Sequence, residues 1–249
     1  MHRMAVRRRF LPMVALAVAA FALAGCVGGA APGTDRPLVI LYGDSLSWES
    51  GSAFESNMGP GANVVHRSFP GVAACDLLPS MAADVATLQP EAVVIEFAGN
   101  MTTPCMHGTT SETVVARYAR DVADAAAIFS ARGIPVYLMG APLLAGWGSD
   151  QTPGMHAAFT AIADKSGLVS FTDAGRSVLD AEGAFTMTLP CLPGETAAMG
   201  CVGGRITVRS PDRVHFCPVA TSGACPVWSS GAWRFGAAMA APVRRDLGL

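Results

Sequence analysis

The chain has 249 residues, of which 51% are hydrophobic and 14% are charged, and its formal net charge is −2 at pH 7. Abundant apolar and sparse charged side chains exclude an intrinsically disordered chain and indicate one domain with a sizeable core. The sequence has no basic stripe interleaved with aromatic residues, so we expect no nucleic-acid partner, and we expect a monomer.

The first 25 residues have the pattern of an export signal. Residues 1–9 carry four arginines and no acid, and residues 10–22 form an apolar run shorter than the ~20 residues needed to span a bilayer. The run leads into the letters LAGC at 23–26, which resemble the bacterial lipobox, whose cysteine is lipidated and becomes the first mature residue. We therefore expect a lipoprotein signal peptide at 1–25 and a lipid anchor on Cys26; a plain signal peptide with a chance cysteine is the alternative.

Residues 26–37 have the Gly, Ala and Pro content of a linker, which would join the lipid to a domain at 38–249. Removal of the signal peptide leaves 13 basic residues against 19 acidic ones, a net charge near −6. The arginines at 7–9 leave twin-arginine export open beside the general secretory route. We expect an exported protein anchored through lipid to the outer face of the cytoplasmic membrane, in the cell envelope.

Beyond the linker, short apolar runs alternate with helix-like segments. Strands are predicted at 38–42, 63–66, 92–97, 134–139 and 168–171, and helices at 47–58, 74–88, 111–132, 153–165 and 230–247. This alternation predicts an α/β fold, a three-layer α/β/α sandwich around a mainly parallel five-stranded sheet of the flavodoxin-like kind. The span 181–210 is rich in Gly, Pro and Cys and is predicted to be a long ordered loop.

Two polar residues follow predicted strands at the edge of the sheet where ligands usually bind. Ser45 follows the strand 38–42, and Asn100 follows the strand 92–97. The segment around Ser45 allows two interpretations. Asp44 and Ser45 are ordinary helix N-caps, or Ser45 is held at the strand end as a nucleophile.

A serine nucleophile needs a base, and the base needs a third group that fixes its tautomer. Asp212 precedes His215 by three residues, a spacing that lets the carboxylate accept a hydrogen bond from the ring in a tight turn. The alternative is a local cap at Asp212 beside a surface histidine. We interpret His66 as structural, since it lies in a strand-like run, and His107 and His156 have no acid at a useful spacing.

Together these residues resemble the SGNH, or GDSL, hydrolase family, and the resemblance covers essentially the whole chain after the linker. The letters GDSL at 43–46 match its first block, and SFPG at 68–71 ends in the glycine of its second block. Asn100 stands where the family has its asparagine, and DRVH at 212–215 matches its final Asp-x-x-His block. The third block departs from the usual Gly-x-Asn-Asp, because it is AGNM at 98–101. The Gly-x-Ser-x-Gly elbow of the larger lipase fold is absent around Ser45.

The resemblance implies a carboxyl-ester hydrolase, an esterase or lipase, that acts through an acyl-enzyme without metal or cofactor. Ser45 would attack the ester carbonyl, His215 would move the proton, and Asp212 would orient His215. The backbone N–H groups of Ser45 and Gly71 and the side chain of Asn100 would bind the oxyanion, while Asp44 is structural. An acyltransferase or deacylase acting on an acylated envelope glycan is one alternative, and a non-catalytic envelope-binding lipoprotein is another.

The substrate, a small-molecule or envelope ester, is not readable from the sequence. Trp48, Trp147 and Trp228 would line an apolar acyl groove or a polar glycan cleft, or they belong to the core.

Six cysteines remain besides Cys26, an even number that indicates disulfides in an exported protein: Cys75, Cys105, Cys191, Cys201, Cys217 and Cys225. No pair has the short gap of a zinc knuckle, so no metal site is expected. Spacing alone leaves the pairing open. Cys75 and Cys105 lie just after Gly71 and Asn100, so a bridge between them would tie the two oxyanion loops together. We expect this pair, with Cys191–Cys201 and Cys217–Cys225 as the other two.

Overall fold

The five apolar runs form one parallel sheet in the computed structural model, which describes residues 36–146 and 150–249. Its strands are β1 (Leu38–Gly43), β2 (Asn63–Ser68), β3 (Ala92–Glu96), β4 (Val136–Met139) and β5 (Val169–Thr172). They lie in the order β2-β1-β3-β4-β5, and each neighbouring pair is parallel. This is the flavodoxin-like doubly wound order, so the predicted fold class is confirmed.

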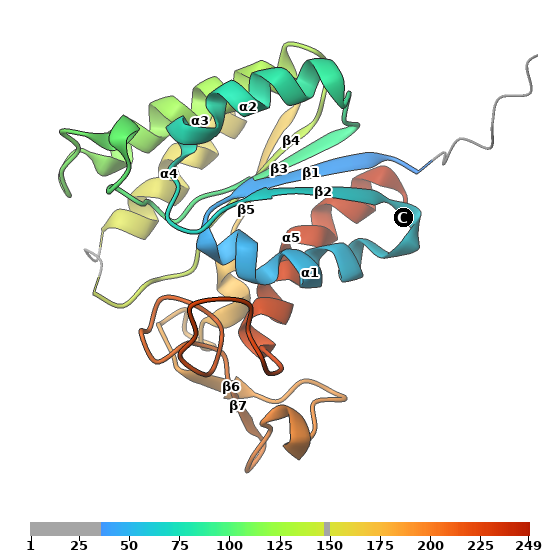
Figure 1. The fold of residues 1–249 in the computed structure, drawn as a ribbon, viewed down its shortest axis with the longest axis vertical. Coiled ribbons are helices and arrows are strands. Elements are labelled where there is room, and N and C mark those ends of the chain that lie inside the picture. Colours follow the sequence, from blue (N-terminus) through green and yellow to red (C-terminus); the bar gives the residue numbers. More distant parts are fainter. Residues whose placement is uncertain (1–35, 147–149) are drawn as a thin grey trace, which may run out of the picture. The chain divides into compact units, whose positions relative to one another are not determined.

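Five helices cover the two faces of this sheet (Figure 1). Helices α1 (Ser45–Met58) and α5 (Ser230–Leu247) pack on one face, and α2 (Ala74–Thr87), α3 (Val114–Ser130) and α4 (Gln151–Ala163) pack on the other. The result is the three-layer α/β/α sandwich. Arg36–Leu249 form one compact unit, and none of the helices described there is long and apolar enough to cross a bilayer.

The central strands β1, β3 and β4 are largely apolar runs because both of their faces are buried, whereas the edge strands β2 and β5 include polar residues. In β1, Val39 and Leu41 point into the core beneath α1 and α5, whereas Ile40 and Tyr42 point into the core beneath α2 and α3. All four side chains are fully buried. A sheet covered on both faces therefore shows no polar alternation in its central strands.

The prediction of a long loop at 181–210 was wrong. This span contains a two-stranded antiparallel hairpin, β6 (Thr188–Pro190) with β7 (Arg205–Thr207), and the Cys191–Cys201 disulfide closes its connection. Arg234 of α5 donates a hydrogen bond to the Pro190 carbonyl oxygen at 2.6 Å and so holds the hairpin against the main body. Strands of three residues are too short to show a period of two, and the surrounding Gly and Pro residues hide them further.

Helix α1 begins two residues earlier than predicted, at Ser45, because Asp44 is its N-cap. Several sequence predictions lie outside the described residues: the signal peptide at 1–25, the lipid site Cys26, the linker residues up to 35, and Trp147.

Candidate active site

Ser45 lies where β1 turns directly into α1. The Asp44 side chain accepts a hydrogen bond from the Leu46 N–H at 3.0 Å and caps the helix, so Ser45 occupies its first turn. The first N–H groups of a helix have no partner within the helix, so the Ser45 N–H is available to a ligand. A side chain at Gly43 would meet the Glu96 carbonyl oxygen at 2.6 Å, so only glycine fits at the strand end.

His215 reaches Ser45 from a tight turn before α5. Its Nε2 lies 2.9 Å from Ser45 Oγ, and its Nδ1 lies 2.6 Å from an Asp212 carboxylate oxygen. Because a carboxylate can only accept, Nδ1 carries the proton and Nε2 is left to accept from the serine hydroxyl. The three side chains thus form one chain of hydrogen bonds in the order that nucleophilic catalysis requires.

The turn itself fixes the Asp212 carboxylate. Arg213 adopts a φ of 64°, in the left-handed region that side chains rarely enter, and this brings the Val214 and His215 N–H groups to Asp212 Oδ1 at 2.9 and 3.0 Å. Burial alone would raise the pKa of Asp212, but the hydrogen bonds from the His215 ring and from these two backbone groups outweigh it and lower the pKa. Asp212 therefore stays charged beside the imidazole at neutral pH.

Gly71 lies in the turn after β2. The Val72 N–H donates to the Phe69 carbonyl oxygen at 3.4 Å, with Pro70 second in the turn and Gly71 third at a φ of 80°. These are the preferred residues of a type II turn, whose third position requires a positive φ. Among the described residues, no acceptor takes the Gly71 N–H, so this group is available to a ligand.

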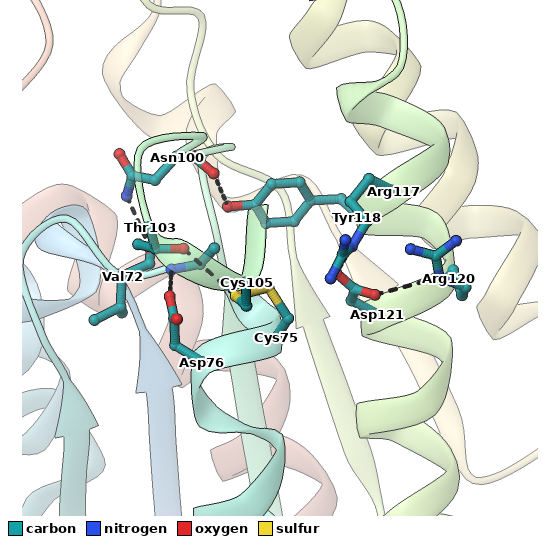
Figure 2. The surroundings of a disulfide bond; sticks show 11 residues. Val72, Cys75, Asp76, Asn100, Thr103, Cys105, Arg117, Tyr118, Arg120 and Asp121 are labelled. Atoms are coloured by element: carbon teal, nitrogen blue, oxygen red, sulfur yellow. Dashed lines mark hydrogen bonds and ion pairs between the residues drawn. A yellow bond between two sulfur atoms is a disulfide. The ribbon is translucent and has the colours of Figure 1, made fainter. Parts of the chain in front are cut away.

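Asn100 is anchored through both its backbone and its side chain (Figure 2). The Tyr118 hydroxyl donates to the Asn100 carbonyl oxygen at 2.8 Å, and Asn100 Nδ2 donates to the Val72 carbonyl oxygen at 3.0 Å. The second Nδ2 contact, to Asp44 Oδ2, is 3.4 Å long and therefore weak. This weakly bound N–H is the one that can turn to a developing negative charge.

Two buried acids lie beneath the site. Asp44 is fully buried, and besides capping α1 it accepts the Ala98 N–H at 2.7 Å. Burial raises the pKa of Asp44 to about 6, against the effect of the hydrogen bonds from Ala98 and Leu46. Glu96 is also fully buried, and burial, with the nearby Asp44, raises its pKa well above the usual value. One Glu96 oxygen accepts from the Ser47 hydroxyl at 2.6 Å, and the other has no partner among the described residues.

The six cysteines form the three expected disulfides, Cys75–Cys105, Cys191–Cys201 and Cys217–Cys225. Cys75 is in the first turn of α2, and Cys105 follows Asn100 by five residues (Figure 2). The first bridge therefore joins the loop of Gly71 to the loop of Asn100, as predicted. With all six sulfurs paired, the cysteines are not metal-binding thiolates.

Sequence analysis missed Glu49, which lies one helical turn after Ser45. Its carboxylate accepts a hydrogen bond of 2.6 Å from the backbone N–H of Phe216, the residue that follows His215 in the chain. Burial raises the pKa of Glu49, against the effect of this hydrogen bond. An acid four residues after Ser45 on the same helix was the available signal. His66, interpreted as structural, contacts Glu55. His156, which has no acid at a useful spacing in the sequence, contacts the Ala141 carbonyl oxygen.

No family model and no curated protein matches this sequence. Among solved structures, the chain is similar to TesA, with 19% identity over 84% of this chain and 99% of that one and a TM-score of 0.52. It is similar to a candidate acylhydrolase from Bacteroides fragilis, with 18% identity over 86% and 92% of the two chains and a TM-score of 0.55. A candidate lipolytic protein of the G-D-S-L family from Desulfitobacterium hafniense matches with 12% identity over 84% and 99% and a TM-score of 0.54. The chain therefore has the fold of the SGNH, or GDSL, lipolytic hydrolases that its sequence motifs resemble.

Proposed function

We propose that the protein is a serine carboxyl-ester hydrolase. The observation that carries the proposal is the unbroken chain from Ser45 Oγ through the His215 ring to Asp212, with contacts of 2.9 and 2.6 Å. This chain begins at a helix N-terminus, where the partial positive charge favours a developing anion. Nucleophile, base and orienting acid therefore meet at the edge of the sheet.

The reaction runs in two halves. Ser45 Oγ attacks the ester carbonyl carbon and passes its proton to His215 Nε2, which then protonates the departing alcohol as the acyl-enzyme forms. Water then attacks the acyl-enzyme, giving its proton to His215, and the carboxylic acid leaves as Ser45 regains its proton. In both halves the oxyanion is bound by the N–H groups of Ser45 and Gly71 and by Asn100 Nδ2.

The test is substitution of the nucleophile. Ser45→Ala is expected to lower hydrolysis of simple esters by several orders of magnitude, because it removes the attacking group while the backbone of α1 stays in place. A fluorophosphonate should label Ser45 in the native protein. Ser170→Ala, at an exposed serine on β5, is the matched control and should leave activity unchanged. Hydrolysis by Ser45→Ala within about tenfold of the native rate would refute the assignment.

We further propose that the chain is exported and anchored through lipid on Cys26. The support is the sequence pattern at 1–26, with residues 26–35 as the tether before the compact unit that starts at Arg36. A single acyl chain gives only marginal membrane binding, so the proposal requires a multiply acylated cysteine. Cys26→Ser should move the protein from membrane to soluble fractions. Mass spectrometry that found an unmodified N-terminus beyond Cys26 would contradict the anchor.

A further inference from the structure

A cavity of about 560 Å³ lies beside the catalytic residues, between α1, α5 and the segment 217–229. Its walls include Trp48, Ser52, Val227, Trp228, Ala232 and Trp233. The catalytic residues themselves do not line it. It nevertheless begins at Glu49, one turn from Ser45, and at Cys217, two residues after His215. The cavity therefore adjoins the nucleophile and the base.

Helix α1 connects the nucleophile to this cavity. Ser45, Ser52 and Ser56 recur at seven and four residues and so lie in a line along one face of the helix. Trp48 and Glu49 stand on either side of that line. At 1.5 Å per residue, Ser52 lies about 10 Å and Ser56 about 16 Å from Ser45 along the helix axis. The line from Ser45 along this face leads to the cavity past Glu49, whose carboxylate is bound by the Phe216 N–H.

The walls of the cavity are mostly hydrocarbon. Trp48 and Val227 are 39% and 48% exposed, large apolar side chains without full cover. The rings of Trp228 and Trp233 pack with centroids 5.4 Å apart, and the Trp228 N–H donates to Glu195 at 3.3 Å. Because its N–H group already has a hydrogen-bond partner, Trp228 presents the apolar atoms of its ring to a ligand. Such a lining is typical of a site for an apolar group.

Some of the polar groups of the lining already have partners. Among the described residues that line it, Glu49 is the one ionisable group, and its carboxylate is bound by the Phe216 N–H. Ser229 Oγ donates to the Phe216 carbonyl oxygen at 2.9 Å and accepts the Ala232 N–H at 3.2 Å. The exposed hydroxyls of Ser52 and Ser56 and the N–H groups of Trp48 and Trp233 remain. These groups are spread over three tryptophan rings, Val227 and alanine side chains, so most of the lining is apolar, which favours an alkyl chain over a glycan.

We propose that this cavity binds the acyl chain of the substrate, an inference that rests on the proposed ester hydrolysis. A staggered alkyl chain with C–C bonds of about 1.5 Å advances about 1.3 Å per bond. An acyl chain of about eight carbons then spans the distance from Ser45 to Ser52, and one of about twelve carbons spans the distance from Ser45 to Ser56. The inferred substrate is an ester of a straight acyl chain of this medium length, rather than an acetyl ester.

The test is an acyl-length series of p-nitrophenyl esters, from acetate to palmitate, with the full-length protein. The value of kcat/KM should rise with chain length, at most roughly fourfold for each buried methylene, and peak near eight to twelve carbons. A profile that falls steadily from acetate would overturn the inference.

Ser52→Phe narrows the cavity about 10 Å from the nucleophile. It should leave hydrolysis of the butyrate ester unchanged and lower kcat/KM for the decanoate ester about tenfold or more, because the last methylenes lose their site. Ser56→Phe should affect only the dodecanoate and longer esters. Ala82→Phe, at an exposed position of α2 on the other face of the sheet, is the matched control. Equal losses on butyrate and decanoate in Ser52→Phe would overturn the inference.

Binding is also measured without activity. Three of the four tryptophans of the chain line the cavity, so intrinsic fluorescence reports its occupancy. Sodium decanoate should change the emission saturably in the native protein but not in Ser52→Phe, and butyrate should have no such effect. If decanoate binds in this way and no ester is hydrolysed, the proposed function fails and the cavity assignment stands. If esters are hydrolysed and decanoate produces no saturable change, the cavity assignment fails alone.

Discussion

Glu49 on α1 accepts a hydrogen bond of 2.6 Å from the backbone N–H of Phe216, the residue that follows His215. One side chain thereby joins the helix that carries Ser45, the proposed nucleophile, to the loop that carries His215, the proposed base. The loop is also held by Ser229, which donates to the Phe216 carbonyl oxygen, and by Arg209, which donates to the Val214 carbonyl oxygen. The Glu49 bond is the side-chain contact from α1 to the backbone beside His215, so we expect Glu49 to act as a positioning residue.

Glu49→Ala should lower kcat by about tenfold to hundredfold, the usual cost of a hydrogen bond to a charged group. Glu49→Gln keeps an oxygen that accepts the Phe216 N–H and should stay within a few-fold of the native kcat. Glu49→Gln should unfold near the native temperature by circular dichroism, whereas Glu49→Ala leaves the N–H of the buried Phe216 without its acceptor and should unfold at a lower temperature. If Glu49→Gln and Glu49→Ala lose kcat equally, the charge of Glu49 matters rather than its hydrogen bond to the loop.

Asn100→Ala should lower kcat by ~10²–10³-fold, as expected when one oxyanion donor is removed. Tyr118→Phe should have a smaller effect in the same direction, because the hydroxyl of Tyr118 holds the Asn100 backbone and not its amide. Steady-state kinetics on one ester shows whether Asn100 acts on kcat, as an oxyanion donor, or on KM, as a substrate-binding residue. A rise in KM at constant kcat for Asn100→Ala would assign the side chain to ground-state binding.

Replacing Cys75 and Cys105 with serine should lower both stability and kcat. The bridge closes a loop of 30 residues, which corresponds to ~3–4 kcal/mol in the chain-entropy treatment. It also ties the Gly71 loop to the Asn100 loop, so its loss should loosen the oxyanion donors. The double serine variant at Cys191 and Cys201, in the hairpin, should lower the melting temperature and leave kcat unchanged. If both double variants are less stable but keep the native kcat, the Cys75–Cys105 disulfide has no role in catalysis.

The buried acids predict a stability that falls as the pH rises. Carboxyl groups ionise near pH 4 in the unfolded chain, whereas burial raises the pKa of Asp44 to about 6 and raises that of Glu96 well above its usual value. Above pH 4 the folded protein therefore binds more protons than the unfolded chain, and the free energy of unfolding decreases with pH. Glu96→Gln removes one such group.

Urea unfolding at pH 5 and pH 8 measures this effect. The native protein should lose more stability between the two values than Glu96→Gln does. Glu182→Gln, at an exposed position, should behave like the native protein. Identical losses in the native protein and in Glu96→Gln would exclude Glu96 as a source of the pH dependence.

The parts of the fold that sequence analysis predicted are those with a local signature. Continuous apolar runs mark β1 and β3 because both faces are buried, and helical spacing with a closing Gly133 marks α3. Of the two interpretations of the segment after β1, the helix cap is confirmed, because Asp44 caps α1. This capping places Ser45 at the edge of the sheet, and its role as a nucleophile stays a prediction.

The parts that sequence analysis did not predict depend on contacts between distant segments. Glu49 meets Phe216 across 167 residues through a backbone N–H, and a backbone acceptor leaves no residue pattern to read. The acyl cavity likewise depends on how α1, α5 and the Cys217–Cys225 loop pack together. The β6–β7 hairpin was missed because its strands have three residues each.

The fully buried carboxylate of Asp44 holds the amide hydrogens of Leu46 and Ala98, which lie outside the sheet. Amides bound to a group without access to water exchange with solvent only when the surrounding structure opens as a whole. Hydrogen–deuterium exchange at these two positions should therefore be as slow as in the central strands. The junction beneath Ser45 then belongs to the last unit of the protein to open, and a partly unfolded molecule keeps its nucleophile in place until the sheet itself is lost.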